Sequence, residues 1–325
     1  MKIFQNKPFL VGLFFIATFL MFCIGFLSRP LFSKIAVPEK QRIVIVCTTS
    51  LIADAARAVC GDLAEVIQLM GPGVDPHVYK VRPSDVRALH AADMIFYNGL
   101  HLEGKMTEIF DALRHNKQKI TAVTNALPKT NLIESSYPGV FDPHIWSDPL
   151  LWKQCVLYMY QTIAATYPEH ASILAEGYKN YQQQLLTLDY TVEEMLSTIP
   201  KDKRILITAH DAFAYFGKRY NYTVLGLQGL STETDIGLRD IELLIDYIIT
   251  HNVHAVFVES CIAPRTMETI QERAKNRGHM IHIGGELFSD ALGDQNSGAD
   301  TYLTMLMHNV TTIVTALQQE SIGIP

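Results

Sequence analysis

The stretch between Pro168 and Pro200 constrains the fold of this chain more than any other. Its apolar residues recur in steps of four and three, which places one stripe along one side of a helix. The stripe consists of Leu174, Tyr178, Tyr181, Leu185, Leu188, Val192, Met195 and Ile199. Pro168 suits the first turn of a helix, and Pro200 cannot continue one. We therefore predict one unbroken helix of about 30 residues, roughly 45 Å long, with Gly177 as its weak point.

The sequence on either side of this helix shows the same pattern. Strand-like apolar runs alternate with helical segments, which predicts parallel βαβ units rather than hairpins. The runs are 42–50, 64–70, 92–97 and 119–123 before the helix, and 204–210, 222–227, 255–259 and 280–283 after it. We expect an α/β protein with two lobes, each with a parallel sheet of about four strands flanked by helices, joined by one long rigid helix. The expected limits are 42–167 and 201–320 for the lobes and 168–200 for the helix.

The N-terminal segment has the layout of an export signal. Residues 8–27 contain no charged side chain, and Lys2 and Lys7 precede them. Such a run is typical of a secretory signal or of an uncleaved membrane anchor. We expect residues 1–30 to direct the chain to the periplasm or to the outer face of the cytoplasmic membrane, and to supply its contact with the membrane.

The five cysteines give neither a disulfide framework nor a thiolate metal site, because no CxxC or metal-finger spacing occurs. Lipid attachment would use Cys23. Because Phe22 stands where bacterial lipoprotein signals carry a small residue, lipidation is the less favoured interpretation. An oxidising compartment leaves a disulfide among the other four open. Cys47 and Cys261 adjoin strand-like runs, where the simplest role is that of a small buried apolar residue.

Composition and charge exclude one class of partner. With 48% hydrophobic and 18% charged residues, the chain of 325 residues has the composition of folded domains and shows no signature of disorder. Its formal net charge is -6, and no basic stripe or basic-aromatic interleaving offsets that charge. Nucleic acid is therefore not an expected partner.

Four residues at loop and strand-end positions could share one metal ion. His77 follows the second strand-like run, His144 precedes a helix, His210 ends the first run of the second half, and Asp290 follows the last run. Ligands bind near the carboxyl ends of parallel strands, so a site is expected in these loops. Three imidazoles and one carboxylate suit Zn2+, Mn2+ or Fe2+. The dispersed spacing leaves open that each histidine instead caps a helix or bonds a loop carbonyl.

Five motifs carry a resemblance to a known family. They are Gly71-Pro-Gly-Val-Asp-Pro-His77, Tyr97-Asn-Gly-Leu-His-Leu-Glu103, Asp142-Pro-His-Ile-Trp146, Thr208-Ala-His-Asp-Ala-Phe213 and Gly284-Gly-Glu-Leu-Phe-Ser-Asp-Ala-Leu-Gly-Asp294. In this order they resemble the metal-binding solute-binding proteins of ABC importers, most closely the TroA type. The resemblance implies one Zn2+ or Mn2+ ion held between two lobes and delivered to a membrane permease. It also implies four ligands, which are His77, His144, His210 and Asp290.

The resemblance leaves the identity of the metal open. Relatives that favour manganese often carry Glu at the position of His210, whereas the TroA type carries His. Zinc-specialised relatives often have a long histidine- and acid-rich loop, which this chain lacks. We expect a monomer that binds Zn2+ or Mn2+, with Fe2+ as a further candidate, as a transported ligand.

His101 and Glu259 lie near the expected site. His101 follows Asn98-Gly99 in a loop, and we favour an exposed position at the start of a helix over contact with the metal. Glu259 ends the third run of the second half. It either accepts a hydrogen bond from a ligand imidazole or caps a helix at the surface.

A metal-dependent hydrolase and a surface adhesin are the alternative functions. A hydrolytic metal site needs an open coordination position and a general base, and neither an HExxH motif nor a serine elbow occurs in the sequence. An adhesin would share export and tethering, but its function would survive loss of the metal ligands. We therefore favour metal capture over catalysis.

Overall fold

The computed structural model describes residues 42–116, 118–233 and 236–322. The expected signal or anchor, residues 1–30, lies outside this part of the chain, as does Cys23. Among the described residues, no helix is both long and apolar enough to cross a lipid bilayer.

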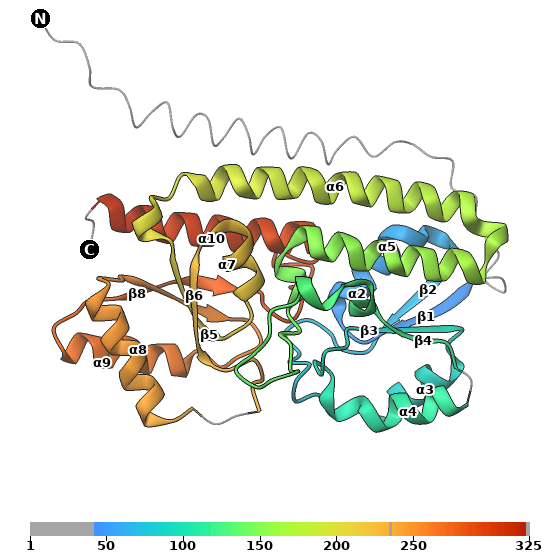
Figure 1. Cartoon of the computed structure of the whole chain (residues 1–325), viewed down its shortest axis with the longest axis horizontal. Coiled ribbons are helices and arrows are strands. Elements are labelled where there is room, and N and C mark those ends of the chain that lie inside the picture. Colours follow the sequence, from blue (N-terminus) through green and yellow to red (C-terminus); the bar gives the residue numbers. More distant parts are fainter. Residues whose placement is uncertain (1–41, 117, 234–235, 323–325) are drawn as a thin grey trace, which may run out of the picture. The chain divides into compact units, whose positions relative to one another are not determined.

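A four-stranded parallel sheet forms the core of the N-terminal lobe, with the order β2-β1-β3-β4. Its strands are β1 (Ile43–Cys47), β2 (Ala64–Gln68), β3 (Met94–Tyr97) and β4 (Ile120–Ala122). The helices are α2 (Ser50–Cys60), α3 (Pro83–Ala91), α4 (Thr107–His115) and α5 (Pro149–Thr166). Helices α3 and α4 lie on one face of the sheet, and α2 and α5 on the other (Figure 1). Ile45, Val46 and Cys47 on the central strand are therefore fully buried, as expected for a parallel sheet covered on both faces.

The C-terminal lobe contains two parallel strand pairs, β5-β6 and β7-β8. The strands are β5 (Ile205–His210), β6 (Thr223–Gln228), β7 (Ala255–Glu259) and β8 (His282–Leu287). The helices are α7 (Ala214–Tyr220), α8 (Leu238–Thr250), α9 (Arg265–Asn276) and α10 (Tyr302–Ile322). Strands β5 and β7 lie side by side, but the described backbone forms no ladder between them. At this seam the backbone N–H of His210 donates to the Glu259 carboxylate at 2.8 Å, so a side chain replaces a strand carbonyl. The expected continuous sheet of about four strands is interrupted there.

Helix α6 (Ala171–Ser197) follows the N-terminal lobe and confirms the predicted apolar stripe. Six residues of the stripe are buried, namely Leu174, Tyr181, Leu185, Leu188, Val192 and Ile199. The α-helix has 27 residues and starts after a 3-10 turn (Pro168–His170), so it is shorter than predicted. Such turns are common at helix ends, where backbone groups lack α-helical partners. Helix α6 runs along both lobes and packs on α2 and α5 of the first and on α10 of the second (Figure 1).

Gly177 lies at a close contact between two helices, which the sequence did not predict. A Cβ atom at this position would lie 2.2 Å from the carbonyl oxygen of Val59, near the end of α2. No real side chain tolerates that distance. The glycine therefore lets the backbones of α2 and α6 touch, and this contact fixes how α2 lies on the long helix.

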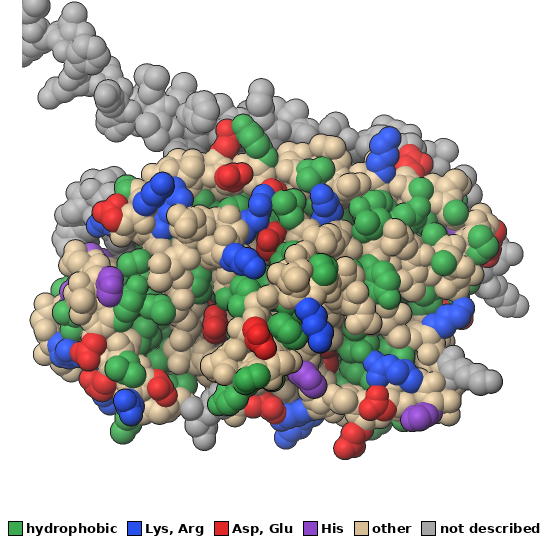
Figure 2. All heavy atoms as spheres, viewed as in Figure 1, with side chains coloured by type: hydrophobic (Ala, Val, Ile, Leu, Met, Phe, Trp, Pro, Cys, Tyr) green, Lys and Arg blue, Asp and Glu red, His purple; other side chains and the backbone are tan. Residues whose placement is uncertain are grey.

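The charges on the surface in view are mixed. Lys and Arg side chains are interspersed with Asp and Glu on the face shown in Figure 2, and no continuous basic stripe crosses that face. A mixed surface with a formal net charge of -6 is consistent with a partner other than nucleic acid.

Replacing Gly177 with alanine tests the contact between α2 and α6. In an open helix this change stabilises by about 1 kcal/mol. Here we expect a loss of about 1–3 kcal/mol, because the new methyl group forces the two backbones apart. Urea unfolding of the metal-free protein measures the difference, and Gln183→Ala, on the exposed side of α6, is the control. A stabilised Gly177→Ala variant would contradict the packing role.

Candidate metal centre

The structure brings together the four residues that the sequence singled out. One donor atom from each of His77, His144, His210 and Asp290 lies within 4.8 Å of every other, and all four residues are buried. Two of them come from each lobe. His77 lies in the loop after β2, His144 just before the 3-10 turn that leads to α5, His210 at the end of β5, and Asp290 after β8. The strand-end positions converge, as the rule for parallel sheets predicts.

Four separations between donor atoms are close to those of ligands that share one small ion. The Nε2 atoms of His77 and His144 are 3.2 Å apart. Asp290 Oδ2 lies 3.3 Å from His210 Nε2 and 3.5 Å from His77 Nε2, and its Oδ1 lies 3.5 Å from His144 Nε2. Ligands about 2.0–2.1 Å from a tetrahedral ion are separated by ~3.3–3.4 Å. The four side chains are therefore spaced as if around one ion.

Asp290 is a buried carboxylate that lacks hydrogen-bond donors among the described residues. Neither of its oxygens accepts a hydrogen bond of normal geometry from the described residues. Burying an ionised carboxylate is costly unless it is paired, hydrogen-bonded or bound to a metal. Both oxygens instead face histidine nitrogens. A divalent cation among these atoms would satisfy both oxygens at once.

Two further carboxylates lie against the rings of candidate ligands. Glu259 is buried and its Oε2 lies 2.6 Å from Nδ1 of His210, so the carboxylate faces this imidazole and does not cap a helix at the surface. Asp142 Oδ1 lies 2.7 Å from Nδ1 of His144. In both His144 and His210 the carboxylate lies against Nδ1, and Nε2 faces Asp290. Carboxylate partners of this kind fix the tautomer and the orientation of metal-binding imidazoles.

Reasoning from the sequence missed Asp142, although a signal was present. The tripeptide Asp-Pro-His occurs at Asp75 and again at Asp142, each time two residues before a site histidine. In both copies the aspartate Oδ1 accepts a hydrogen bond from the histidine backbone N–H at 2.8 Å. The aspartate thus shapes the turn that presents the histidine. The repetition of this tripeptide could have identified both residues.

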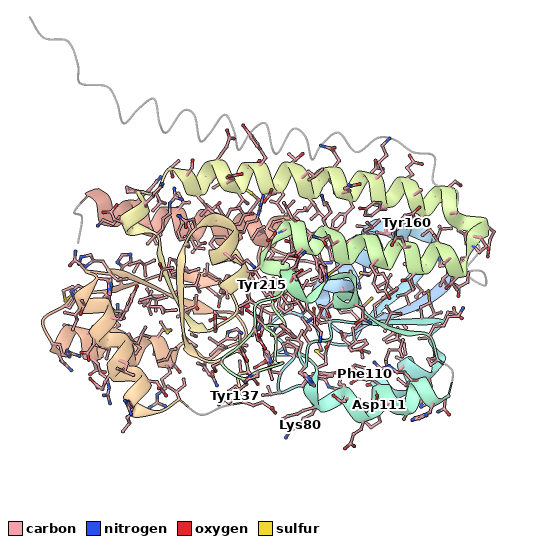
Figure 3. The ribbon with its side chains drawn as sticks, viewed as in Figure 1. Lys80, Phe110, Asp111, Tyr137, Tyr160 and Tyr215 are labelled. Atoms are coloured by element: carbon pink, nitrogen blue, oxygen red, sulfur yellow. The ribbon has the colours of Figure 1, made fainter. Side chains whose placement is uncertain are left out.

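Hydrogen bonds between the lobes surround the centre. Tyr215, on α7 of the C-terminal lobe, donates to the carbonyl of Asp142 at 2.9 Å and accepts from the backbone N–H of Ile133. Figure 3 labels this tyrosine near the middle of the view, where the two lobes meet. Asp75 Oδ2 accepts a hydrogen bond from Thr232, a residue of the C-terminal lobe. The loops that carry His77 and His144 are therefore tied to the opposite lobe.

Burial and charge shift the pKa values of the site residues in different directions. Burial lowers the pKa of His77 to about 3. Burial opposes ionisation of Asp290, but His210, His144 and His77 outweigh it and hold the pKa of that carboxyl well below its usual range. Burial likewise disfavours the charged form of His210, but Glu259 and Asp290 raise its pKa well above the usual value. Without a metal ion, His210 therefore holds a proton between two carboxylates.

His101 does not belong to the centre. Its side chain is exposed, and its backbone has a φ of 65°, in the left-handed region. It is not among the residues whose donor atoms converge. The exposed position favoured from the sequence is confirmed.

The sequence of this chain is similar to a family model and to proteins of known name. The family model described as ZnuA, zinc-uptake complex component A, periplasmic, matches residues 45–316. The manganese-binding lipoprotein MntA of Bacillus subtilis (strain 168) is 42% identical over 278 residues, which cover 86% of this chain and 90% of MntA. The zinc-binding protein TroA of Treponema pallidum (strain Nichols) is 40% identical over 285 residues, covering 88% and 92%.

A solved structure agrees with the sequence comparison. The periplasmic zinc-binding protein TroA from Treponema pallidum superposes with a TM-score of 0.83 at 40% identity, covering 85% of this chain and 99% of that one. The match therefore includes both lobes and the long helix. The chain belongs to the ZnuA/TroA family of metal-binding periplasmic substrate-binding proteins.

Proposed function

We propose that this protein captures a divalent transition metal ion outside the cytoplasm and delivers it to the permease of an ABC importer. The ligands are His77, His144, His210 and Asp290. The observation that carries the proposal is the convergence of their four donor atoms, which include a buried carboxylate with no hydrogen bond from the described residues. The names of the relatives, one zinc-binding and one manganese-binding, support the class of ligand.

The proposed domain limits follow from where the ligands lie. Residues 42–167 form one metal-binding lobe and residues 201–320 the other, each with two ligands, and residues 168–200 link them. Residues 1–30 act as the export signal or membrane anchor. Lipoprotein names among the relatives favour an anchored form, for which Cys23 is the candidate acceptor despite Phe22 before it. The protein acts as a monomer that meets the permease at the membrane.

Binding, rather than catalysis, suits the centre. The three histidines and Asp290 offer four protein ligands, the number found in closed metal sites, whereas catalytic zinc sites have three protein ligands and a water molecule. The nearby carboxylates Asp142 and Glu259 are engaged with ligand rings, so neither is placed as a general base. The chain also belongs to a family of transport proteins, which favours metal binding over catalysis.

The donor set admits several metals, with zinc bound most tightly of the three candidates. Affinity of such a site follows the divalent series, in which Zn2+ exceeds Fe2+ and Mn2+ whatever the cell imports. The metal that binds most tightly in vitro therefore does not identify the metal that is transported. Elemental analysis of the protein isolated from its native compartment under metal-limited growth identifies it.

Removing one ligand tests the assignment. We expect His144→Ala to weaken Zn2+ binding by more than about 100-fold, because loss of even an outer partner of a ligand costs 10–100-fold. The wild-type protein should gain ~2.7 kcal/mol of stability at a free Zn2+ concentration of 100 times its dissociation constant, and the variant should gain almost none at that concentration. Competition titrations and thermal unfolding measure both. His101→Ala, at an exposed histidine, is the control, and a His144→Ala variant with wild-type affinity would refute the site.

Zinc affinity should rise with pH through neutrality. Coordination requires His210 Nε2 to lose its proton, and the two carboxylates beside this residue raise its pKa well above the usual value. If metal binding displaces one proton, the affinity for Zn2+ falls about tenfold for each pH unit below that pKa. Because the pKa of His210 is raised, the affinity should still depend on pH above about 6.5, the ordinary pKa of histidine. Dissociation constants measured between about pH 6.5 and 8.5 report this slope. Calorimetry in buffers of different ionisation enthalpy counts the protons, and equal affinities across this range would contradict the expectation.

A further inference from the structure

The segment that carries Asp290 is held on both sides by residues of the opposite lobe. The indole Nε1 of Trp146 donates to the carbonyl of Ser289 at 2.7 Å. On the other side, the backbone N–H of Leu292 donates to the hydroxyl of Ser50 at 2.8 Å. Ser50 is the first residue of α2, and Trp146 lies in the 3-10 turn after His144. All four residues are buried, so water does not compete for these bonds.

The C-terminal lobe itself secures the ends of this segment. Asn309 on α10 accepts from the backbone N–H of Phe288 at 2.9 Å and donates to its carbonyl at 2.7 Å. At the far end, Gly293 N–H donates to Ala299 O at 2.9 Å. Between these anchors, the residues before and after Asp290 take hydrogen bonds from the N-terminal lobe.

Trp146 also contacts a ligand of its own lobe. Its ring lies 5.3 Å from the His144 ring, edge to face, measured between centroids. Its backbone carbonyl accepts a hydrogen bond from the hydroxyl of Tyr302, at the start of α10, at 2.8 Å. The side chain therefore sits between one ligand ring and the backbone beside another ligand.

We propose that Ser50 and Trp146 are positioning residues that place the Asp290 carboxylate for metal binding, so that the donor set is complete only when the lobes are docked. The inference rests on the proposed function. Asp290 is the one donor of the four with a formal negative charge, and its attraction to a cation depends on its position. Although Asp290 belongs to the C-terminal lobe by sequence, the N-terminal lobe fixes its backbone on both sides.

The test compares two hydroxyl deletions that differ in one respect. Ser50→Ala removes the acceptor for Leu292. Ser289→Ala removes a buried hydroxyl that makes no hydrogen bond to the described residues, while the Ser289 carbonyl stays in place. We expect Ser50→Ala to weaken Zn2+ binding about tenfold or more, in the range for outer partners of metal ligands, and Ser289→Ala to stay within about twofold. Trp146→Phe, which keeps an aromatic ring without the donor, should resemble Ser50→Ala.

Three further measurements separate positioning from general destabilisation. The visible absorption of bound Co2+ reports coordination geometry, and it should change in Ser50→Ala and in Trp146→Phe but not in Ser289→Ala. Urea unfolding of the metal-free proteins shows whether each variant is folded. In an Asp290→Ala background, adding Ser50→Ala should leave the residual Zn2+ affinity unchanged, because Ser50 acts through Asp290.

The outcomes distinguish this inference from the proposed function. Wild-type protein that binds neither Zn2+ nor Co2+ would overturn both. Wild-type binding together with unchanged affinity and Co2+ spectrum in folded Ser50→Ala and Trp146→Phe would overturn the positioning role alone. An equal loss of affinity from Ser50→Ala in the presence and absence of the Asp290 carboxylate would also overturn it.

Discussion

The buried negative charge at the junction of the two lobes is the constraint on which the rest of the structure depends. Three carboxylates, Asp290, Asp142 and Glu259, are buried around three imidazoles. Neutral rings cannot balance that charge, so the metal-free protein must hold protons there, as the raised pKa of His210 indicates. A divalent cation supplies the missing charge and replaces a proton. Folding, ion binding and protonation are therefore linked at one point, and neither lobe contains the whole arrangement.

Much of the architecture could be predicted from the sequence because its signals are local. The apolar stripe follows from spacing along one helix, and five of its residues on α6 are buried as expected, as is Ile199 just after the helix. Apolar runs in the sequence predicted each of the eight strands found among the described residues, because buried parallel strands must be apolar on both faces. The seam between β5 and β7 could not be predicted, since it depends on one side chain, Glu259, reaching across to a backbone N–H. The close contact at Gly177 could not be predicted either, because an approach of two helices leaves no mark in the sequence beyond the glycine itself.

The candidate site shows the same division between local and long-range information. Strand-end positions identified His77, His144, His210 and Asp290 as possible ligands, but gaps of many tens of residues cannot show that four side chains converge. The resemblance to a known family indicated that the four residues form one site, and the short distances between their donor atoms agree with that prediction. Asp142 was missed because its role toward His144 is visible only when the repeated Asp-Pro-His turns are compared.

Helix α2 contacts two distant parts of the structure, one at each of its ends. Near its last turn, the carbonyl of Val59 is pressed against Gly177 of the long helix, and at its first residue Ser50 bonds the segment that carries Asp290. Its 11 residues form a stiff rod ~16 Å long between these points. A displacement of α2 at its contact with α6 would therefore be felt at its first residue, which bonds the segment that carries Asp290. The long helix and the candidate metal centre are therefore connected through a single short helix, which contacts Gly177 at one end and the Asp290 segment at the other.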